Sequence, residues 1–431
     1  MNFTIDKIHK LFLKSTGITT DSRTIERDNI FFALKGENFN GNKFASFAIE
    51  KGASFAIVDD KEYASNLNCI LVDDVLKTLQ LLATFHREQF HIPLIGITGT
   101  NGKTTTKEFI NAVLSTQYKT LATKGNLNNH IGVPLTLLSI TNQTEIAIIE
   151  MGANHPGEIA DLCAIAKPNA AIITNIGKAH LEGFINIENI IETKTALYRS
   201  VKEVNGKTFV NVSDKILLEK AKDNYNVTYG DQIDADYYGV IESVSPYLKI
   251  KWGQKLENNI ETQIAGAYNF QNIMAAIAIG CEYGISPKNI NRAISEYIPS
   301  INRSQVLKTK SNTLLLDAYN ANPTSMKAAI DNFIMISNPK NAMILGDMME
   351  LGEESYTEHL DIYNHIIKSG IENIFFIGEI FSSIAKAKSS INCFTNSAEA
   401  LEWFKKHPLK DSFILVKGSR AMKLETLTAA L

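Results

Sequence analysis

Short, almost continuous apolar runs alternate with longer stretches of helical periodicity along most of the chain. We predict buried strands from these runs, at residues 92–98, 145–151, 170–176, 208–212, 313–319, 341–347, 373–378 and 412–418. Strands that are apolar on both faces are typical of a parallel sheet with helices on each side. The helical stretches between the runs indicate βαβ units, so we expect an α/β fold with parallel sheets.

Turn-rich and polar segments divide this pattern into blocks. Residues 31–44, FFALKGENFNGNKF, belong to an N-terminal block that ends near residues 91–93. Pro299 and the polar segment SINRSQ after it have the composition of a linker. We therefore expect three domains, at residues 1–90, 91–299 and 300–431.

The strand at residues 92–98 runs into a glycine-rich loop, GTNGKTT, and then into a helical pattern. A strand, a glycine-rich loop and a helix in this order form a phosphate-binding loop, in which backbone N–H groups surround the phosphates of ATP. The spacing departs from the usual G-x-x-x-x-G-K-[ST], since residue 97 is isoleucine. We still prefer an ATP site to a chance GKT in a turn, because the strand and helix are both present. The predicted ATP-binding residues are Gly99, Thr100, Asn101, Gly102, Lys103, Thr104 and Thr105.

Three side chains near this loop are candidate metal ligands. The Thr104 hydroxyl would hold Mg²⁺ in a phosphate-binding loop. Glu150 ends one predicted strand and His180 follows the end of the next, which is where open α/β sheets bind ligands. A single glutamate or histidine after a strand is more often only solvated or capping a helix, but their joint position beside a phosphate-binding loop favours a magnesium site.

Lys194 lies within the apolar stripe of a predicted helix, IENIIETKTALYRSV. A charged group is rarely placed on such a stripe without a partner. One interpretation is a lysine whose stem covers the core while its amine stays in water. The other is a functional amine near the metal site that carries a modification.

Other polar segments are candidate substrate-binding loops. TDSR, at residues 20–23, contains Ser22 and Arg23, and GNLNNHIGVPLTLL, at residues 125–138, contains Asn126 and Asn129. On their own, both segments are better explained as turns or loops.

A helix and three C-terminal loops complete the candidate site. Asn269 and Asn272 fall on one face of a predicted helix, where their amides would bind adenine or ribose unless the face is simply polar. Beyond Arg303, the segments DAYNANPTSM, LGDMMELGE and VKGSRAMKLE each follow a predicted strand. Polar clusters at several strand ends indicate a binding crevice.

The composition adds mainly exclusions. Hydrophobic residues make up 45% of the chain and charged residues 21%, and the net charge is −3, which argues against a nucleic-acid or membrane-surface partner. No run approaches the roughly 20 apolar residues of a membrane span, and the first residues lack the apolar core of a signal peptide. The cysteines are far apart and offer neither a zinc site nor a disulfide framework. We expect a cytoplasmic protein that acts as a monomer on small molecules.

These motifs together resemble the Mur ligases over nearly the whole chain. GTNGKTT, EMG at residues 150–152, the strand before His180, Lys194 and the Asn269/Asn272 helix match the general pattern of the family. DAYNANPTSM, LGDMMELGE and KGSRAMKLE resemble the branch that adds D-alanyl-D-alanine rather than a single amino acid.

The resemblance implies three domains: a UDP-substrate-binding domain, a central ATPase and a C-terminal Rossmann-like domain. It also implies ATP-dependent addition of D-alanyl-D-alanine to a UDP-linked muramyl tripeptide through an acyl phosphate, with Mg²⁺ as cofactor. The reaction serves peptidoglycan synthesis. The third residue of the tripeptide, diaminopimelate or lysine, stays open.

The resemblance also implies roles for particular residues. Lys103, His180 and Lys194 act in catalysis, and Lys194 is a carbamylated lysine that binds a second Mg²⁺. Asn269 and Asp317 contact ATP, while Ser22 and Arg23 lie in the UDP-binding domain. The turn NGNKF, at residues 40–44, departs from the D-G-H-D-F form of many relatives, which leaves individual UDP contacts open.

Two alternatives compete with this interpretation. One is a related ligase that adds a single amino acid to a muramyl peptide or glutamate to folate, and the C-terminal motifs argue against it. The other is a nucleotide-dependent binding or regulatory module without catalysis. The presence of Lys103, Glu150, His180 and Lys194 argues against that module.

Overall fold

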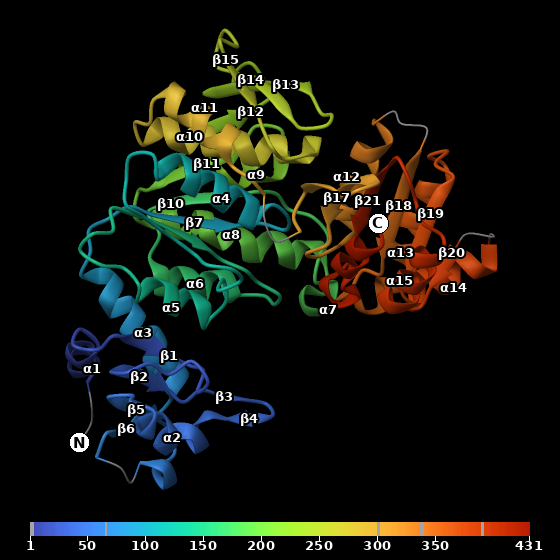
Figure 1. Cartoon of the computed structure of the whole chain (residues 1–431). Helices are drawn as coiled ribbons and strands as arrows, with labels where there is room; N and C mark the ends of the chain where they lie inside the picture. Colours follow the sequence, from blue (N-terminus) through green and yellow to red (C-terminus); the bar gives the residue numbers. More distant parts are fainter. Residues whose placement is uncertain (1–3, 65–66, 300–301, 337–339, 389–391) are drawn as a thin grey trace.

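The computed structural model describes residues 4–64, 67–299, 302–336, 340–388 and 392–431. Its strands form three larger sheets and one two-stranded hairpin, and helices cover the larger sheets (Figure 1). Residues 300 and 301 of the linker expected after Pro299 lie outside the described residues.

The N-terminal sheet is small and entirely parallel, with the order β1-β2-β5-β6. Its elements are α1 (Ile5–Phe12), β1 (Gly17–Thr19), β2 (Asn29–Phe32), the hairpin β3 (Lys35–Gly36) and β4 (Phe39–Asn40), α2 (Ala45–Glu50), β5 (Phe55–Val58), β6 (Cys69–Leu71) and α3 (Val75–Glu88). None of these strands was predicted, because runs of two to four residues are too short to show a periodicity.

The central sheet has the order β15-β14-β13-β12-β11-β10-β7-β9-β8. Strands β8 to β13 pair in parallel, and β14 and β15 extend the edge in antiparallel pairing. The strands are β7 (Leu94–Thr98), β8 (Thr120–Ala122), β9 (Ile146–Glu150), β10 (Ala170–Ile173), β11 (Lys207–Asn211), β12 (Tyr225–Gly230), β13 (Tyr237–Ser243), β14 (Lys249–Trp252) and β15 (Asn258–Glu261). Strands β7, β9, β10 and β11 confirm the predicted runs in this part of the chain, whereas β8 and β12 to β15 were not predicted.

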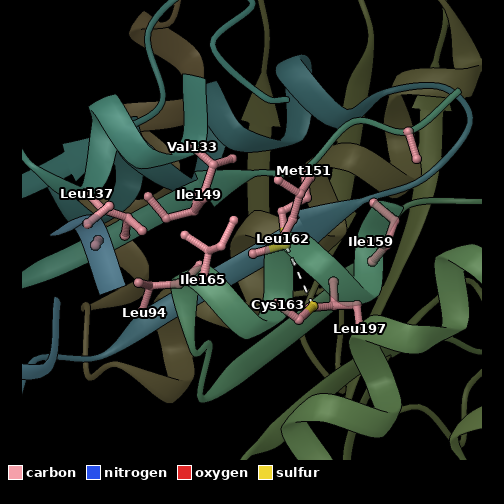
Figure 2. Packing of buried hydrophobic residues seen from close by; sticks show 14 of the residues in the cluster. Leu94, Val133, Leu137, Ile149, Met151, Ile159, Leu162, Cys163, Ile165 and Leu197 are labelled. Atoms are coloured by element: carbon pink, nitrogen blue, oxygen red, sulfur yellow. Dashed lines mark hydrogen bonds between the residues drawn. The ribbon is translucent and has the colours of Figure 1, made fainter. Parts of the chain in front are cut away.

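Helices cover both faces of this sheet. They are α4 (Lys103–Leu114), α5 (Gly132–Leu137), α6 (Glu158–Ala166), α7 (Leu181–Phe184), α8 (Ile187–Glu203), α9 (Lys215–Ala221), α10 (Phe270–Glu282) and α11 (Pro287–Glu296). Alternate residues of β9 serve opposite faces: Ile148 packs with the cluster under α4 and α10, and Ile149 with the cluster under α5 and α6. Figure 2 shows the second cluster, in which Leu94 and Ile149 of the strands meet Leu137 and Leu162 of the helices. This double burial explains the continuous apolar runs.

The C-terminal sheet has the order β16-β17-β21-β18-β19-β20, parallel except for β16. Its elements are β16 (Gln305–Lys308), β17 (Asn312–Asp317), α12 (Pro323–Ile334), β18 (Asn341–Gly346), α13 (Ser355–Ile367), β19 (Asn373–Ile377), α14 (Glu379–Lys388), β20 (Asn392–Phe394), α15 (Ser397–Lys406) and β21 (Ser412–Lys417). The four predicted C-terminal strands are confirmed as β17, β18, β19 and β21. The expected α/β class with parallel sheets is therefore confirmed.

The three larger sheets use residues 17–71, 94–261 and 305–417. The domain divisions near residues 90 and 300 stay a prediction. The packing of α3 shows why the first division has no sharp boundary. Leu79 and Leu82 of α3 belong to one continuous apolar cluster that contains Ile30 of the N-terminal sheet and Leu94 of the central one. None of the helices within the described ranges is both long and apolar enough to cross a membrane.

A buried histidine pair lies at the junction of the first two blocks. His86 Nε2 lies 2.9 Å from the Ile140 carbonyl oxygen, so it carries the proton and leaves Nδ1 as an acceptor. His9 Nε2 therefore donates to His86 Nδ1, at 3.0 Å. Burial lowers the pKa of both imidazoles, and for His9 the neighbouring His86 lowers it further. Both rings are thus neutral in the folded protein.

This pair predicts an acid-sensitive junction. An unfolded histidine takes up a proton near pH 6.5, whereas these two imidazoles resist it in the folded state, so stability should fall as the pH drops below about 6.5. We expect His9→Gln to reduce that loss, because glutamine still donates to His86 but does not titrate. The measurement is the thermal unfolding midpoint at pH 7 and pH 5.5, with the exposed His91→Gln as control. Equal acid losses in wild type and His9→Gln would contradict the assignment.

Candidate active site

The loop at residues 99–102 joins β7 to α4, as the sequence analysis predicted, and both its glycines are required by the space around them. Gly99 has a φ of +144°, and a Cβ there would lie 2.0 Å from Thr174 Oγ1. Gly102 has a φ of +81°, and a Cβ there would lie 2.5 Å from Asn272 Oδ1. Glycine is the residue that tolerates both the conformation and the close approach.

The end of β10 supports this loop from below. Asn175 Oδ1 accepts from the backbone N–H of Asn101, and Asn175 Nδ2 donates to the Asn101 carbonyl, both at 3.0 Å. Thr174 Oγ1 donates to the same carbonyl at 2.5 Å. The backbone of Thr100 is held by the carbonyl of Asn175 at 2.9 Å. The loop is therefore fixed by a neighbouring strand as well as by its own helix.

Lys103 begins α4 and folds back over the loop. Its Nζ donates to the carbonyl oxygens of Gly99, at 2.6 Å, and Thr100, at 3.0 Å. Burial lowers the pKa of Lys103 to about 8, opposed by Glu150 and reinforced by Arg303. An anionic ligand at the loop would stabilise the charged form of this amine and accept a hydrogen bond from it.

Glu150 ends β9 with one carboxylate oxygen held and one free. Its Oε1 accepts from Asn128 Nδ2 at 2.8 Å, and its backbone N–H donates to Thr123 Oγ1 at 2.9 Å. The side chain is nearly fully buried, and its Oε2 has no hydrogen-bond partner in the structure. A buried carboxylate oxygen without a partner is costly unless a cation or a donor binds there, so this atom suits a metal ligand.

His180 lies after β10 and faces the C-terminal domain. Its Nδ1 is 2.5 Å from Glu350 Oε2, and this contact lowers the pKa of Glu350. Two residues earlier, Lys178 pairs with Glu358 at 2.7 Å. The segment between β10 and α7 therefore joins the central and C-terminal domains.

Lys194 lies on α8 beneath the loop rather than in the wall of the cavity. Its side chain is only 3% exposed, and its Nζ donates to the Gly99 carbonyl at 3.2 Å. Burial, and after it the nearby Lys103, hold the pKa of this amine well below its usual value. The structure thus supports a buried amine and does not place its head in water.

The metal donors do not form an all-protein cage. Within the described ranges, no three His, Cys, Asp or Glu side chains gather closely enough to hold an ion. Thr104, in the first turn of α4, lines the same cavity as Glu150 and His180. Mg²⁺ is commonly bound by one or two protein oxygens together with substrate phosphates and water, and this donor set fits that mode.

A cavity of about 700 Å³ brings these residues together between the central and C-terminal domains. That volume is within the range of nucleotide-sized and drug-sized ligands. The predicted residues that line it are Thr100, Asn101, Gly102, Lys103, Thr104, Thr105, Asn126, Asn129, Glu150, His180, Asn269 and Asp317.

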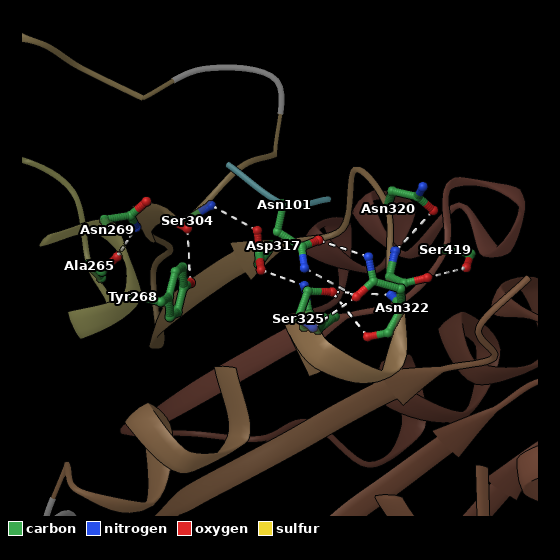
Figure 3. Close-up of polar contacts among 12 residues, drawn as sticks. Asn101, Ala265, Tyr268, Asn269, Ser304, Asp317, Asn320, Asn322, Ser325 and Ser419 are labelled. Atoms are coloured by element: carbon green, nitrogen blue, oxygen red, sulfur yellow. Dashed lines mark hydrogen bonds and ion pairs between the residues drawn. The ribbon is translucent and has the colours of Figure 1, made fainter. Parts of the chain in front are cut away.

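The C-terminal wall presents charged groups at the ends of β17 and β21. Lys417 Nζ pairs with Asp317 Oδ2 at 2.6 Å. The backbone N–H of Ser304 donates to Asp317 Oδ1 at 3.1 Å, as Figure 3 shows. The Arg303 guanidinium lies 3.7 Å from the centre of the Tyr319 ring, and its buried Nε has no partner. Asp317 is thus oriented within the cavity, and Arg303 offers an unused donor.

Asn269 and Asn272 lie on one side of the start of α10, but their amides are occupied. Asn269 Nδ2 donates to the Ala265 carbonyl at 2.8 Å, as Figure 3 shows. Asn272 Nδ2 donates to Asn269 Oδ1 at 3.0 Å, and Asn272 Oδ1 accepts from Thr106 Oγ1 at 3.0 Å. These bonds hold α10 against α4, which favours a positioning role. Their contact with adenine or ribose stays a prediction.

The remaining predicted residues occupy two different places. Asn129 Oδ1 accepts from the backbone N–H groups of Ile131 and Gly132, so this amide closes a turn at the rim of the cavity. Ser22 and Arg23 follow β1 in the N-terminal domain and do not line the cavity; Arg23 pairs with Asp21 at 2.6 Å.

Several residues that line the cavity or support the loop had no individual role in the sequence predictions. They are Thr174, Asn175, Arg303, Tyr319, Asn322 and Lys417. Most lie at or just after the carboxyl end of a parallel strand. That position is the feature by which the sequence could have identified them as site residues.

Comparisons with known proteins agree along the chain. Family models match in order: "Mur ligase family, catalytic domain" at residues 14–87, "Mur ligase middle domain" at residues 97–280, and "Mur ligase, glutamate ligase domain" at residues 302–420. The chain is 38% identical over 427 residues to the UDP-N-acetylmuramoyl-tripeptide–D-alanyl-D-alanine ligase of Bacillus subtilis, covering 95% of this chain and 92% of that one. The enzyme of the same name from Escherichia coli is 30% identical and covers 96% and 93%.

Solved structures agree with these relatives. A crystal structure of MurF from Acinetobacter baumannii superposes with a TM-score of 0.88 at 30% identity, covering 99% of this chain and 98% of that one. A MurF ligase from Thermotoga maritima, solved in complex with ADP, has a TM-score of 0.86 at 25% identity and covers 97% of each chain.

The loop geometry predicts that Lys103→Ala weakens nucleotide binding. The variant removes a charge-assisted donor to the phosphates and leaves the backbone of the loop in place, so ADP affinity should fall about 10- to 100-fold. Isothermal titration calorimetry with ADP measures this loss. Lys119→Ala, an exposed lysine before β8, should bind ADP like wild type. Unchanged ADP affinity in a folded Lys103→Ala protein would remove this lysine from the phosphate site.

Proposed function

The chain belongs to the Mur ligase family, and we propose that its interdomain cavity joins D-alanyl-D-alanine to UDP-N-acetylmuramoyl-tripeptide at the expense of ATP. The relatives support this activity: two enzymes named UDP-N-acetylmuramoyl-tripeptide–D-alanyl-D-alanine ligase are 30% and 38% identical to this chain over nearly its full length. The product is the UDP-muramyl-pentapeptide precursor of peptidoglycan, and ADP and phosphate are released. The expectation of a Mur ligase that adds the dipeptide is confirmed.

The reaction divides into two transfers. The terminal carboxylate of the tripeptide attacks the γ-phosphorus of ATP, which forms an acyl phosphate and releases ADP. The amine of D-alanyl-D-alanine then attacks the acyl carbon, loses a proton as the amide forms, and displaces phosphate. Such transfers depend mainly on alignment and on neutralising negative charge. Lys103 and Arg303, which both line the cavity, supply that positive charge.

ATP binds in this proposal with its phosphates on the loop at residues 99–105. Lys103 and the loop N–H groups that are not bonded to Asn175 hold the phosphates. Asp317 of the C-terminal domain and Asn269 at the start of α10 contact the rest of the nucleotide. The relative solved with ADP supports nucleotide use by this fold.

Mg²⁺ would be held by Thr104, Glu150 and His180. The free Glu150 Oε2 supports this assignment. His180 supports it as well, because metal-binding histidines usually present their second ring nitrogen to a carboxylate, as His180 does to Glu350. Bound Mg²⁺ would neutralise charge on the phosphate oxygens.

Lys194 is carbamylated in this proposal and completes the metal site. Its amine is buried and its pKa is well below the usual value, so the neutral form that attacks CO₂ is available. Attack forms an N–C bond and releases one proton to water. The product replaces a buried donor by a carboxylate that accepts hydrogen bonds or binds a cation.

The UDP part of the acceptor binds in the N-terminal domain, where Ser22 and Arg23 lie, and Asn126 and Asn129 guide the peptide toward the phosphates. We divide the chain into domains at residues 1–90, 91–299 and 300–431, since each larger sheet draws its strands from one of these ranges. We also propose that the protein acts as a monomer on these small-molecule substrates. The need for ATP supports a cytoplasmic location.

The substrate assignment predicts a strict requirement for the dipeptide. With ATP and UDP-muramyl-tripeptide, phosphate release should be rapid with D-alanyl-D-alanine and about 10⁴-fold slower with D-alanine, since polar groups meant for the second residue stay unpaired. The assay measures phosphate release across single amino acids, L-alanyl-L-alanine and acceptors of different stem length. Preference for a free amino acid, or for a folate acceptor, would overturn this assignment and leave an ATP-dependent ligase.

The carbamate predicts a spectroscopic signal at Lys194. Protein in ¹³C-labelled bicarbonate should show a carbamate carbon resonance that is lost in Lys194→Ala together with most of the activity. The resonance should persist in Lys202→Ala, an exposed lysine on the same helix. Its absence from active wild-type enzyme would reject the modification.

A further inference from the structure

Asn101 and Asn322 form a reciprocal pair of side-chain amides across the cavity. Asn322 Nδ2 donates to Asn101 Oδ1 at 2.8 Å, and Asn101 Nδ2 lies 3.4 Å from Asn322 Oδ1. Figure 3 shows the two amides facing each other, one from the phosphate-binding loop and one from the start of α12. The residues are 221 positions apart in sequence, so the contact exists only while the C-terminal domain lies against the central one.

The Asn101 side of this pair is fixed to the central domain through its backbone. Asn175 holds both the N–H and the carbonyl of Asn101, and Thr174 holds the carbonyl as well. The N–H of Asn101 is therefore engaged by the protein, and its side chain points to Asn322 and not to the floor of the loop. These contacts favour a structural link over a direct phosphate contact for this side chain.

The Asn322 side is fixed to the C-terminal domain. Asn322 is the N-cap of α12, where its Oδ1 accepts from the backbone N–H of Ser325 at 2.9 Å and its own N–H donates to Ser325 Oγ at 3.1 Å. Two residues further, Thr324 packs on Gly177, where a Cβ would lie 2.9 Å from Thr324 Oγ1. The start of α12 is thus a rigid body that contacts the central domain at two points.

We propose that Asn322 is a positioning residue for the phosphate-binding loop, acting through the side chain of Asn101. The series Asn175, Asn101 and Asn322 links the end of β10, the loop and α12. Docking of the C-terminal domain thereby fixes the loop in the geometry that receives the nucleotide phosphates. The inference rests on the proposed use of this loop for ATP. By linkage, nucleotide binding favours docking as much as docking favours binding.

The decisive variant removes the pair and keeps the helix cap. Serine is as good an N-cap as asparagine but is too short to reach Asn101, so Asn322→Ser should preserve α12. Asn101→Ala removes the pair from the other side and leaves the backbone bonds to Asn175 in place. Losing one net hydrogen bond should weaken nucleotide binding about fivefold in each variant.

The test is a double-mutant cycle read by the affinity for ADP and for β,γ-imido-ATP, measured by calorimetry. We expect each single variant, and also the double variant, to lose about fivefold, because the second change has nothing left to remove. Asn396→Ser, which makes the same substitution at the exposed N-cap of α15, should bind like wild type. Thermal midpoints of Asn322→Ser and Asn396→Ser should agree, which separates positioning from helix stability.

Two outcomes would overturn the proposal. One is wild-type nucleotide affinity in both single variants, and the other is a double variant whose loss is the product of the single losses. Neither outcome touches the proposed reaction, which is tested separately by dipeptide-dependent phosphate release in the wild-type enzyme. Conversely, nucleotide binding without ligation would remove the reaction and leave this coupling in place.

Discussion

Two lysine amines share one carbonyl oxygen beneath the phosphate-binding loop. Lys103 approaches the Gly99 carbonyl from the start of α4, and Lys194 approaches it from α8. Burial, and after it the charge of Lys103, lower the pKa of the Lys194 amine, because like charges in an enclosed site repel. The arrangement is therefore incomplete without anions. Phosphate groups above the loop, the free oxygen of Glu150 and a carbamate on Lys194 all relieve the same excess of positive charge.

The loop can hold this charge because it is rigid. Thr174 and Asn175, just after β10, hold the Asn101 backbone at its carbonyl and at its N–H. Two adjacent strands of the parallel sheet thus position the loop: β7 leads directly into it, and the residues after β10 hydrogen-bond to its backbone. The third, β9, delivers Glu150 to the same edge.

The sequence predicted what is local and strongly periodic. Continuous apolar runs located β7, β9, β10 and β11 of the central sheet and β17, β18, β19 and β21 of the C-terminal sheet. The strand–loop–helix order located Lys103 and Thr104. The strands of the N-terminal sheet were missed because they are three or four residues long. β13 was missed because only one of its 7 residues, Gly239, is buried, so it shows no continuous apolar run. The partners of Glu150, Asp317 and Asn101 were missed for another reason. Asn128, Lys417 and Asn322 come close to them only after folding, and nothing in the residues between them records that approach.

The two junctions of this chain differ in what water can do to them. The first junction is packed by a continuous apolar cluster that runs from Ile30 through Leu82 to Leu94. Separating it would expose apolar surface to water, and no interaction with water would compensate for that cost. The second is spanned by amide and ion pairs such as Asn101–Asn322 and Lys178–Glu358, whose hydrogen bonds water can replace at small net cost. The two junctions therefore differ in stiffness. Thermal motion would rotate the C-terminal domain as a rigid body, while the first two domains move together as one unit.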